Sequence, residues 1–320
     1  MEHSQRSISR RALLSLGGGG AAALGMLALL PKARAMNGGM HQAPLKQAGG
    51  KLPFDPQQCL RSFDQGQLLI EQGQPVRSFE LEARSITLPL APEVNFKAWS
   101  VNGRVPGPTL RARQGERLRV LFRNRDSTAH SLHVHGVHPA AMDGVTPVLQ
   151  GRDAVYEFDL PRAGLYPYHC HVAPVARHVG KGMFGLLIVD PPQARPPADE
   201  LVLVMGGYDL DNDGRNELYA FNGIPDAYMH EPIVIRQNNL VRLYLLNMVE
   251  LDPPLTFHIH GNEFAVVGTG ESVITDVITL GIGERQMLEF RYPYTGRYMF
   301  HPHQDVIAER GCMGLFDVIT

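Results

Sequence analysis

The sequence of 320 residues predicts an all-β protein made of two similar domains in tandem. Glycine and proline are frequent, with 33 and 24 residues, which suits many short strands joined by turns. Short alternating or β-branched runs, such as 118–122, 154–158 and 185–189, recur between turn signals. The same short motifs also occur twice in the same order. The net charge of −2 gives no indication of a nucleic-acid or anionic partner.

Five pairs of motifs carry the repeat, and their common order predicts a duplicated domain. They are Val101-Asn102-Gly103 with Phe221-Asn222-Gly223, Arg113-Gln114-Gly115 with Arg236-Gln237-Asn238, His133-Val134-His135-Gly136 with His258-Ile259-His260-Gly261, Gly164-x-Tyr166-x-x-His169 with Gly296-x-Tyr298-x-x-His301, and Gly182-Met183-Phe184-Gly185 with Gly311-Cys312-Met313-Gly314. We therefore expect domain 1 over 76–192 and domain 2 over 201–320. The proline-rich stretch 193–200 is the expected linker.

The first 35 residues are typical of an export signal. Arg10-Arg11 precedes an uncharged stretch over 12–30, and Ala33-Arg34-Ala35 offers a small-x-small cleavage site. This pattern resembles a twin-arginine signal, which predicts a periplasmic or secreted protein without stable membrane insertion. An uncleaved membrane anchor is the alternative, because the stretch is almost long enough to span a bilayer. Residues 36–75, rich in Gly, Gln and Pro, predict an extended N-terminal arm.

Histidine is the informative residue type. Four His-x-His pairs are present, two in each predicted domain: His133 and His135, His169 and His171, His258 and His260, and His301 and His303. Residues i and i+2 of a strand point to the same face, so each pair offers two imidazoles to one metal or to two adjacent metals. Imidazole suits copper and zinc. Four pairs at matched positions predict metal sites in both domains.

A second donor set surrounds the only cysteine that lies between two histidines. Cys170 stands in His169-Cys170-His171, His178 and Met183 follow, and His130 precedes His133 by three residues. Two imidazoles, one thiolate and a weak axial thioether are the ligands of a blue (type 1) copper. We therefore expect a type 1 copper held by His130, Cys170, His178 and Met183.

The pattern His-x-x-His-x-His-Gly, followed by His-Cys-His-x6-His-x4-Met, resembles the copper motifs of multicopper oxidases over residues 76–320. The resemblance implies cupredoxin-like Greek-key β-sandwich or barrel domains, about four coppers per chain and a trinuclear cluster held by eight histidines. It also implies the roles of those eight. The type 2 copper would be held by His133 and His258, and the type 3 pair by His135, His169, His171, His260, His301 and His303.

Domain 2 has lost every blue-copper ligand. Leu255, Pro302, Ile307 and Cys312 stand where domain 1 has His130, Cys170, His178 and Met183. This layout resembles the two-domain laccase-like oxidases whose blue copper lies in domain 1. That resemblance implies a homotrimer with the trinuclear cluster at each subunit interface.

The same resemblance implies a laccase-like reaction. A phenolic or metal-ion donor would lose one electron near His178, the ligand expected to lie toward the surface. Four such electrons would reduce O2 to water. Asp143, in Met142-Asp143-Gly144, is the candidate proton relay, and a turn aspartate before glycine is its alternative reading.

Two other functions stay open at this stage. A copper-containing nitrite reductase shares the two-domain layout but needs fewer histidines, and a non-enzymatic electron carrier needs only the blue site. Cys59 and Cys312 are left as a possible disulfide. The run Asp209-x-Asp211-x-Asp213-Gly214 lacks the final glutamate of a calcium loop, so a polar turn is favoured. His138 and His230 fit no pair and are expected to be non-ligands.

Overall fold

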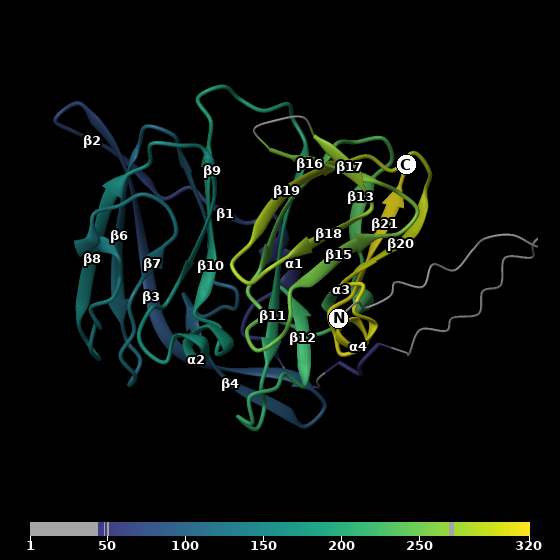
Figure 1. Cartoon of the computed structure of the whole chain (residues 1–320), viewed down its shortest axis with the longest axis horizontal. Helices are drawn as coiled ribbons and strands as arrows, with labels where there is room; N and C mark the ends of the chain where they lie inside the picture. The colour runs from purple at the N-terminus through teal and green to yellow at the C-terminus, as the bar shows by residue number, and fades with distance from the viewer. Residues whose placement is uncertain (1–43, 48, 50, 269–271) are drawn as a thin grey trace, which may run out of the picture. The chain divides into compact units, whose positions relative to one another are not determined.

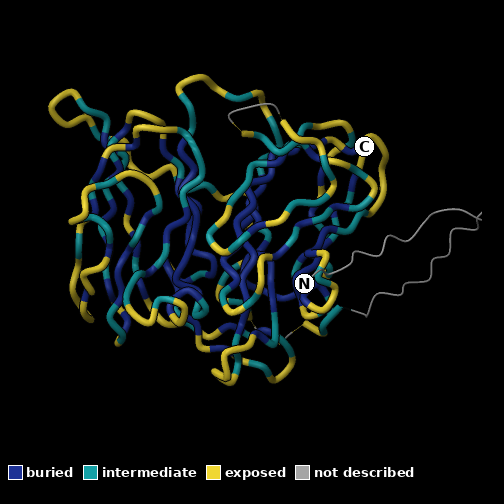
Figure 2. Tube along the Cα trace, viewed as in Figure 1, coloured by how far each residue is buried: buried dark blue, intermediate teal, exposed yellow. Residues whose placement is uncertain are grey.

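The computed structural model describes residues 44–47, 49, 51–268 and 272–320. The predicted signal sequence over 1–35 lies outside these residues. The described part is mostly β, as predicted, with buried residues along the strands and exposed residues at the loops (Figures 1 and 2). No helix within the described ranges is long and apolar enough to cross a membrane.

Domain 1 consists of two five-stranded sheets. In the first, β4 (Val94–Val101) pairs with β3, and the remaining strands follow the order β2 (Gln67–Glu71), β3 (Gln74–Ala91), β6 (Arg117–Asn124) and β8 (Asp153–Asp159). The second has the order β1 (Phe63–Asp64), β5 (Thr109–Arg113), β10 (Phe184–Asp190), β9 (Gly164–His169) and β7 (His133–Val134). The strand β6 alternates buried and half-buried residues, because one face packs on the core and the other does not.

Domain 2 repeats this arrangement. Its six-stranded sheet has the order β12 (Leu218–Phe221), β11 (Asp199–Tyr208), β14 (Val241–Asn247), β19 (Arg285–Phe290), β16 (Phe264–Val267) and β17 (Val273–Thr275). Its five-stranded sheet has the order β13 (Ile233–Arg236), β21 (Gly314–Ile319), β20 (Gly296–His301), β15 (Leu255–Ile259) and β18 (Val277–Leu280). The order β13-β21-β20-β15 matches β5-β10-β9-β7 of domain 1, so the repeat read from the motifs is also a repeat of topology.

The helices are short. They are α1 (Pro56–Arg61), the 3-10 helix η1 (Ala140–Met142), α2 (Val175–Gly180), α3 (Ala227–His230) and α4 (Asp305–Ala308). The helix α1 precedes the first described strand, and the others lie in connections between strands. Two of them, α2 and α4, occupy equivalent places, each between the second His-x-His pair of its domain and the last strand of that domain. The helix α2 carries His178, whereas α4 carries Ile307 in its place.

The segment that precedes domain 1 differs from the extended arm expected over 36–75. Its described part contains α1, β1 and β2. Leu60 of α1 is fully buried in the hydrophobic core of domain 2, and the side-chain hydroxyl of Tyr228 donates to the carbonyl of Pro56 at 2.8 Å. The strand β1 instead pairs in parallel with β5 of domain 1. The apolar side chains of α1 thus find their partners more than a hundred residues further along the chain, which local composition does not reveal.

An ion-pair network joins strands of the two domains. Arg111 of β5 contacts Glu200 of β11 at 2.6 Å and Asp190 of β10 at 2.6 Å. Glu200 in turn accepts hydrogen bonds from Tyr244 and from the buried Arg242. A set of apolar residues from both domains, including Leu186 and Val204, packs in a common buried cluster beside it. Cys59, Cys170 and Cys312 are all free, so the possible pairing of Cys59 with Cys312 is not formed.

Candidate metal centres

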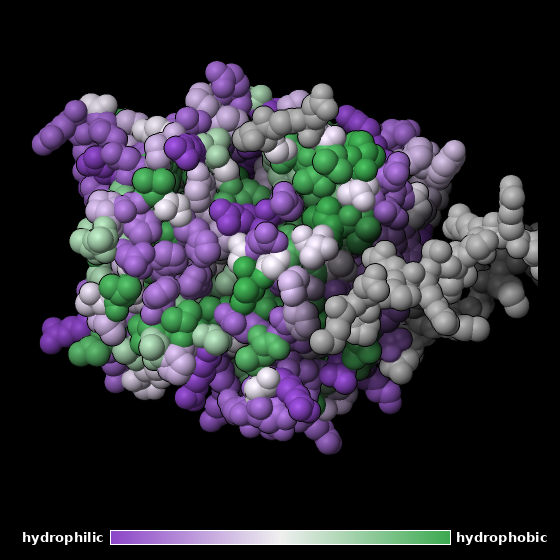
Figure 3. Space-filling view, in the orientation of Figure 1, coloured by the Kyte–Doolittle hydropathy of each residue, from purple (hydrophilic) through white to green (hydrophobic). Residues whose placement is uncertain are grey.

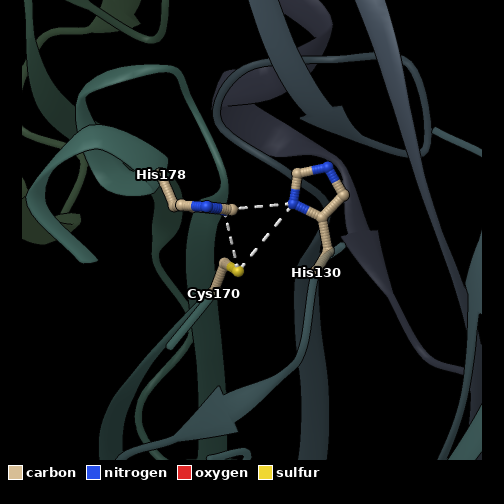
Figure 4. Close-up of side chains that lie close together, drawn as sticks. All are labelled: His130, Cys170 and His178. Carbon is tan, nitrogen blue, oxygen red and sulfur yellow. Dashed lines mark hydrogen bonds between the residues drawn. The ribbon is translucent and has the colours of Figure 1, made fainter. Parts of the chain in front are cut away.

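Three buried donor atoms converge in domain 1 (Figure 4). The Sγ atom of Cys170 lies 3.2 Å from Nδ1 of His178 and 3.8 Å from Nδ1 of His130. The two Nδ1 atoms are 3.2 Å apart. The side chains are buried, with relative exposures of 0% for His130, 1% for Cys170 and 3% for His178. His178, the ligand expected to lie toward the surface, is the most exposed of the three but is still buried.

Local backbone structure fixes each member of this set. His130 forms a β-bridge with Val148, Cys170 directly follows β9, and His178 lies in α2. Met183 is 1% exposed, and its backbone links Cys170 at the end of β9 to His178 in α2. Its N–H donates to the carbonyl of His178 at 3.1 Å, and its carbonyl accepts the N–H of Cys170 at 3.0 Å.

The chemistry of the donor set fits copper. A trigonal metal with bonds of about 2.0–2.3 Å would hold its donor atoms roughly 3.5–3.8 Å apart, close to the spacings observed. Burial, together with the neighbouring His130 and Arg177, lowers the pKa of His178 to about 4. Burial also lowers the pKa of His130, although the carboxylate of Asp126 opposes this effect. Neutral imidazoles are the form that binds a metal.

The first two His-x-His pairs of the chain form one four-histidine set in domain 1. The ladder between β7 and β9 aligns His133 directly with His169. Nε2 of His135 lies 3.2 Å from Nε2 of His169, and the ring centroid of His171 lies 5.2 Å from that of His133. The predicted pairs are thus brought together by strand register, as the i, i+2 spacing implies.

Domain 2 contains the equivalent set. Here β15 pairs with β20 and aligns His258 with His301. Nε2 of His260 lies 2.9 Å from Nε2 of His301, and the ring centroids of His258 and His303 are 4.9 Å apart. These contacts, like those in domain 1, each join two histidines of the same domain. Each domain therefore presents four clustered imidazoles of its own.

Backbone carbonyls set the tautomers of four of these histidines. A carbonyl only accepts, so an Nδ1 atom beside it must carry the proton. The Nδ1–H groups donate to carbonyl oxygens at 2.8–3.0 Å, in the pairs His133 with Asp143, His169 with Cys170, His258 with Asp276 and His301 with Pro302. Each ring therefore offers the lone pair of Nε2. Such outer partners orient metal-binding imidazoles and raise their basicity.

Asp143, the candidate proton relay, lies beside His133. Its Oδ1 is 3.2 Å from Nδ1 of His133, and its side chain is 41% exposed. Gly144 follows with a φ of +77°, a conformation that L side chains rarely adopt, and a Cβ there would clash with the carbonyl of Leu132. The tight turn at Gly144 therefore holds Asp143 against His133.

Two neighbours of these sets were not predicted as part of a site. Nε2 of His138 lies 3.8 Å from Oδ1 of Asp143, and its ring centroid is 5.6 Å from that of His133. Asp276 contacts His258 as Asp143 contacts His133, with an Oδ2-to-Nδ1 distance of 3.7 Å. Each domain thus places an aspartate carbonyl on the first histidine of its first pair, but the spacings of 10 and 18 residues differ, so the repeated motifs do not reveal Asp276.

The remaining candidates lie elsewhere. The carboxylates of Asp209, Asp211, Asp213 and Glu217 approach within 4.8 Å of one another, and they accept backbone N–H groups of their own loop, as in a polar turn. Nε2 of His230 donates to the carbonyl of Leu45 at 2.7 Å, which agrees with a structural role.

A tandem of β-sandwich domains with a buried two-histidine, one-cysteine donor set defines a copper-binding protein. Comparison with family models agrees. Two models of multicopper oxidase domains match this chain, one over residues 83–194 and the other over 195–320. A crystal structure of a multicopper oxidase is 43% identical, with a TM-score of 0.82 over 84% of this chain and 98% of that one. The chain belongs to the multicopper oxidase family, and copper is its cofactor.

Copper-containing nitrite reductases are also related. The enzyme of Neisseria meningitidis serogroup B is 28% identical over 268 residues, which cover 75% of this chain and 68% of that protein. The structure of a nitrite reductase from Thermus scotoductus SA-01 is 26% identical, with a TM-score of 0.69 over 76% of this chain and 62% of that one. Multicopper oxidases and nitrite reductases are thus both among the relatives of this chain.

Proposed function

We propose that this chain is a laccase-like oxidase that couples one-electron oxidation of a phenolic or metal-ion donor to four-electron reduction of O2 to water. His130, Cys170, His178 and Met183 hold the type 1 copper. His133 and His258 hold the type 2 copper. The type 3 pair is held by His135, His169, His171, His260, His301 and His303. About four coppers per chain follow from this assignment.

One observation carries the proposal: two sets of four clustered imidazoles accompany the buried thiol site. A single catalytic copper would use about half of these histidines and leave the others without a role. Eight imidazoles are the number that a three-copper cluster takes in the multicopper oxidases that the sequence resembles. Bound copper supplies the one-electron acceptor and the site of O2 reduction, which side chains alone do not provide.

The residues of this chain give the electron and the protons their paths. Cys170 is covalently joined to His169 and His171, so the thiol site and the four-histidine set of domain 1 are one backbone step apart. The carbonyl of Cys170 also accepts the Nδ1–H of His169 at 3.0 Å. Asp143, half-exposed beside His133, can take a proton from solvent and hold it next to the cluster.

A homotrimer fits the separation of the two sets. Each domain holds half of the eight histidines, and a head-to-tail contact between domain 1 of one copy and domain 2 of the next closes into a ring. Apolar side chains gather over β17 and β18 in Figure 3, where Val273 and Ile274 are 63% and 60% exposed. In domain 1, Val137 and Val145 lie close in sequence to His135 and Asp143, and they are 65% and 56% exposed. Sedimentation should give three times the chain mass, and a monomer with full activity would contradict the shared cluster.

Export through the twin-arginine route is part of the proposal, because Arg10-Arg11 and Ala33-Arg34-Ala35 have the order and spacing of such a signal. N-terminal sequencing of protein recovered from the periplasm or the medium should begin at residue 36. Recovery from the cytoplasm alone, with the N-terminus intact, would contradict this.

Nitrite reduction is the second candidate, because nitrite reductases are among the relatives of this chain. The copper content per chain and the electron acceptor distinguish the two candidate reactions. The oxidase should bind about four coppers per chain, show near-ultraviolet absorption beside the blue band and consume O2 with a donor such as hydroquinone. About two coppers per chain with nitrite turnover would favour the reductase, and blue absorption without either turnover would favour an electron carrier.

The variant His171→Val tests the cluster independently of the blue site. We expect the blue band to remain while O2 uptake and the near-ultraviolet band are lost. The matched control is His230→Val, which removes an imidazole that contacts the carbonyl of Leu45 instead. Full O2 uptake by the His171 variant would overturn the assignment of the cluster.

A further inference from the structure

The buried thiol site exposes almost no donor side-chain surface to a reducing substrate. The relative exposures of His130, Cys170, His178 and Met183 are all 3% or less. A side chain that packs between these ligands and the surface can therefore carry an electron to the site. Whichever residue touches both the imidazoles and the surface is the candidate for that step.

Trp99 meets both conditions. It is the only tryptophan of the chain and lies in β4, on the sheet next to the site. Its ring centroid is 4.6 Å from that of His178 and 5.2 Å from that of His130. These separations correspond to direct packing of aromatic rings. Unlike the four ligands, Trp99 is partly exposed.

Both the backbone and the ring of Trp99 have partners near α2. The backbone N–H of Trp99 donates to the carbonyl of Lys181 at 2.8 Å, which ties β4 to the end of α2. The guanidinium of Arg177, the exposed residue directly before His178, lies over the ring at 5.6 Å from its centroid. A cation over the indole face is attracted to the ring and disfavours loss of an electron from it. The indole is therefore suited to conduct an electron without becoming oxidised.

We propose that Trp99 is the positioning residue for electron entry: its indole couples the surface electronically to the imidazoles of His178 and His130. This inference rests on the proposed type 1 copper. In the step, a one-electron donor at the surface is oxidised, and the copper is reduced from Cu(II) to Cu(I). The electron crosses the indole and an imidazole by tunnelling, so no bond forms or breaks and Trp99 ends the step unchanged.

Two variants of the copper-loaded chain test this. Trp99→Leu removes the aromatic ring, and Trp99→Phe keeps one. Anaerobic stopped-flow mixing with hexacyanoferrate(II) measures how fast the blue absorption bleaches, without involving O2. We expect Trp99→Leu to bleach about tenfold more slowly than the unmodified chain and Trp99→Phe to stay within about threefold of it. Copper content and the position of the blue band should be unchanged in both variants.

The control is Phe96→Leu, which removes an aromatic ring from the same strand. Its ring contacts Tyr208 and Lys181, so bleaching should keep its rate. In the unmodified chain, tryptophan fluorescence reports Trp99 alone, and copper loading should quench it strongly. Unquenched fluorescence, or equal bleaching rates in all variants, would overturn the role of Trp99 and leave the proposed oxidase standing. Absence of a blue band from the copper-loaded unmodified chain would instead overturn the copper site itself.

Discussion

The backbone carbonyl of Asp276 accepts the Nδ1–H of His258 at 2.8 Å, as the carbonyl of Asp143 accepts that of His133 at 2.9 Å. The two carboxylates differ more than the carbonyls do. Oδ1 of Asp143 lies 3.2 Å from the imidazole nitrogen, and Oδ2 of Asp276 lies 3.7 Å away. In both domains an aspartate carbonyl therefore orients the first histidine. The carboxylate of that aspartate lies closer to the imidazole in domain 1 than in domain 2.

The first prediction concerns these two carboxylates. Asp143→Asn keeps the backbone carbonyl that orients His133 and replaces the carboxylate with a neutral amide that cannot carry a proton, so copper content should not change. O2 uptake should fall roughly a hundredfold, as expected for loss of a general acid or base, while anaerobic reduction of the blue site keeps its rate. Asp276→Asn should have the smaller effect. Loss of copper from the Asp143 variant would show that the carboxylate acts on metal binding instead.

The second prediction concerns the buried carboxylate of Asp126. It lies 3.6 Å from Nε2 of His130 and is held by Ser85 and by the backbone N–H of Thr128. Its negative charge favours the more positive, oxidised state of the adjacent site. Asp126→Asn should therefore raise the reduction potential of the blue copper, by roughly 60 mV for a tenfold shift in the equilibrium.

A redox titration of the blue absorption measures this shift. Asp153→Asn is the matched control, because the side chain of Asp153 is 43% exposed and pairs with Arg125. A potential that is lowered, or shifted equally in the two variants, would contradict the role given to Asp126.

The third prediction concerns Cys170. Its thiol lies in the buried donor set and accepts the N–H of Ser131 at 3.3 Å. Cys170→Ser replaces a soft thiolate with a hydroxyl that binds copper poorly, so the blue absorption should disappear and copper content should drop by about one per chain. Electron paramagnetic resonance should still detect the type 2 copper. A Cys170→Ser protein that stays blue and oxidises hydroquinone would refute the ligand assignment.

The fourth prediction concerns pH. Burial alone would raise the pKa of Glu200, but hydrogen bonds from Arg111 and Tyr244 outweigh it, and the pKa is lowered overall. The stabilisation from this group is thus fully present above the unfolded pKa of about 4.3 and is lost as the pH falls through the folded value. Glu200→Gln should cost about 2 kcal/mol of unfolding free energy at pH 7, the scale of a hydrogen bond to a charged group.

Urea unfolding of the copper-free chain at two pH values checks this. The difference in unfolding free energy between the unmodified and Glu200→Gln proteins should shrink below pH 4, where the carboxylate becomes protonated. A difference that is constant or larger in acid would mean that Glu200 acts through packing and not through its charge.

The clustering of the His-x-His histidines could be predicted from sequence because it depends on local strand geometry. Residues i and i+2 share a face whatever the rest of the fold does, and the repeat indicated which pairs meet. Cys170, His178 and Met183 are similarly close in sequence. His130 and His133 lie in the same short segment, so one motif positions donors of both sites.

The residues that sequence reasoning missed act across long separations. Trp99 reaches the imidazoles from β4, 31 positions before His130 and 79 before His178. Asp276 lies 18 residues after His258, between β17 and β18, and no short motif links them. The burial of His178 was likewise not predictable, because it depends on how β4 and α2 pack together.

The path of the N-terminal segment has a consequence for how the chain is made and divided. Leu60 completes the core of domain 2, although domain 2 is synthesised last. A fragment that begins at residue 195 would therefore lack part of its own core and expose the apolar surface that α1 covers. Contacts between residues so far apart in the sequence raise the contact order of the chain and slow its folding. The natural unit of stability is thus the whole chain from α1 onward, and a cut in the linker would not yield two independent halves.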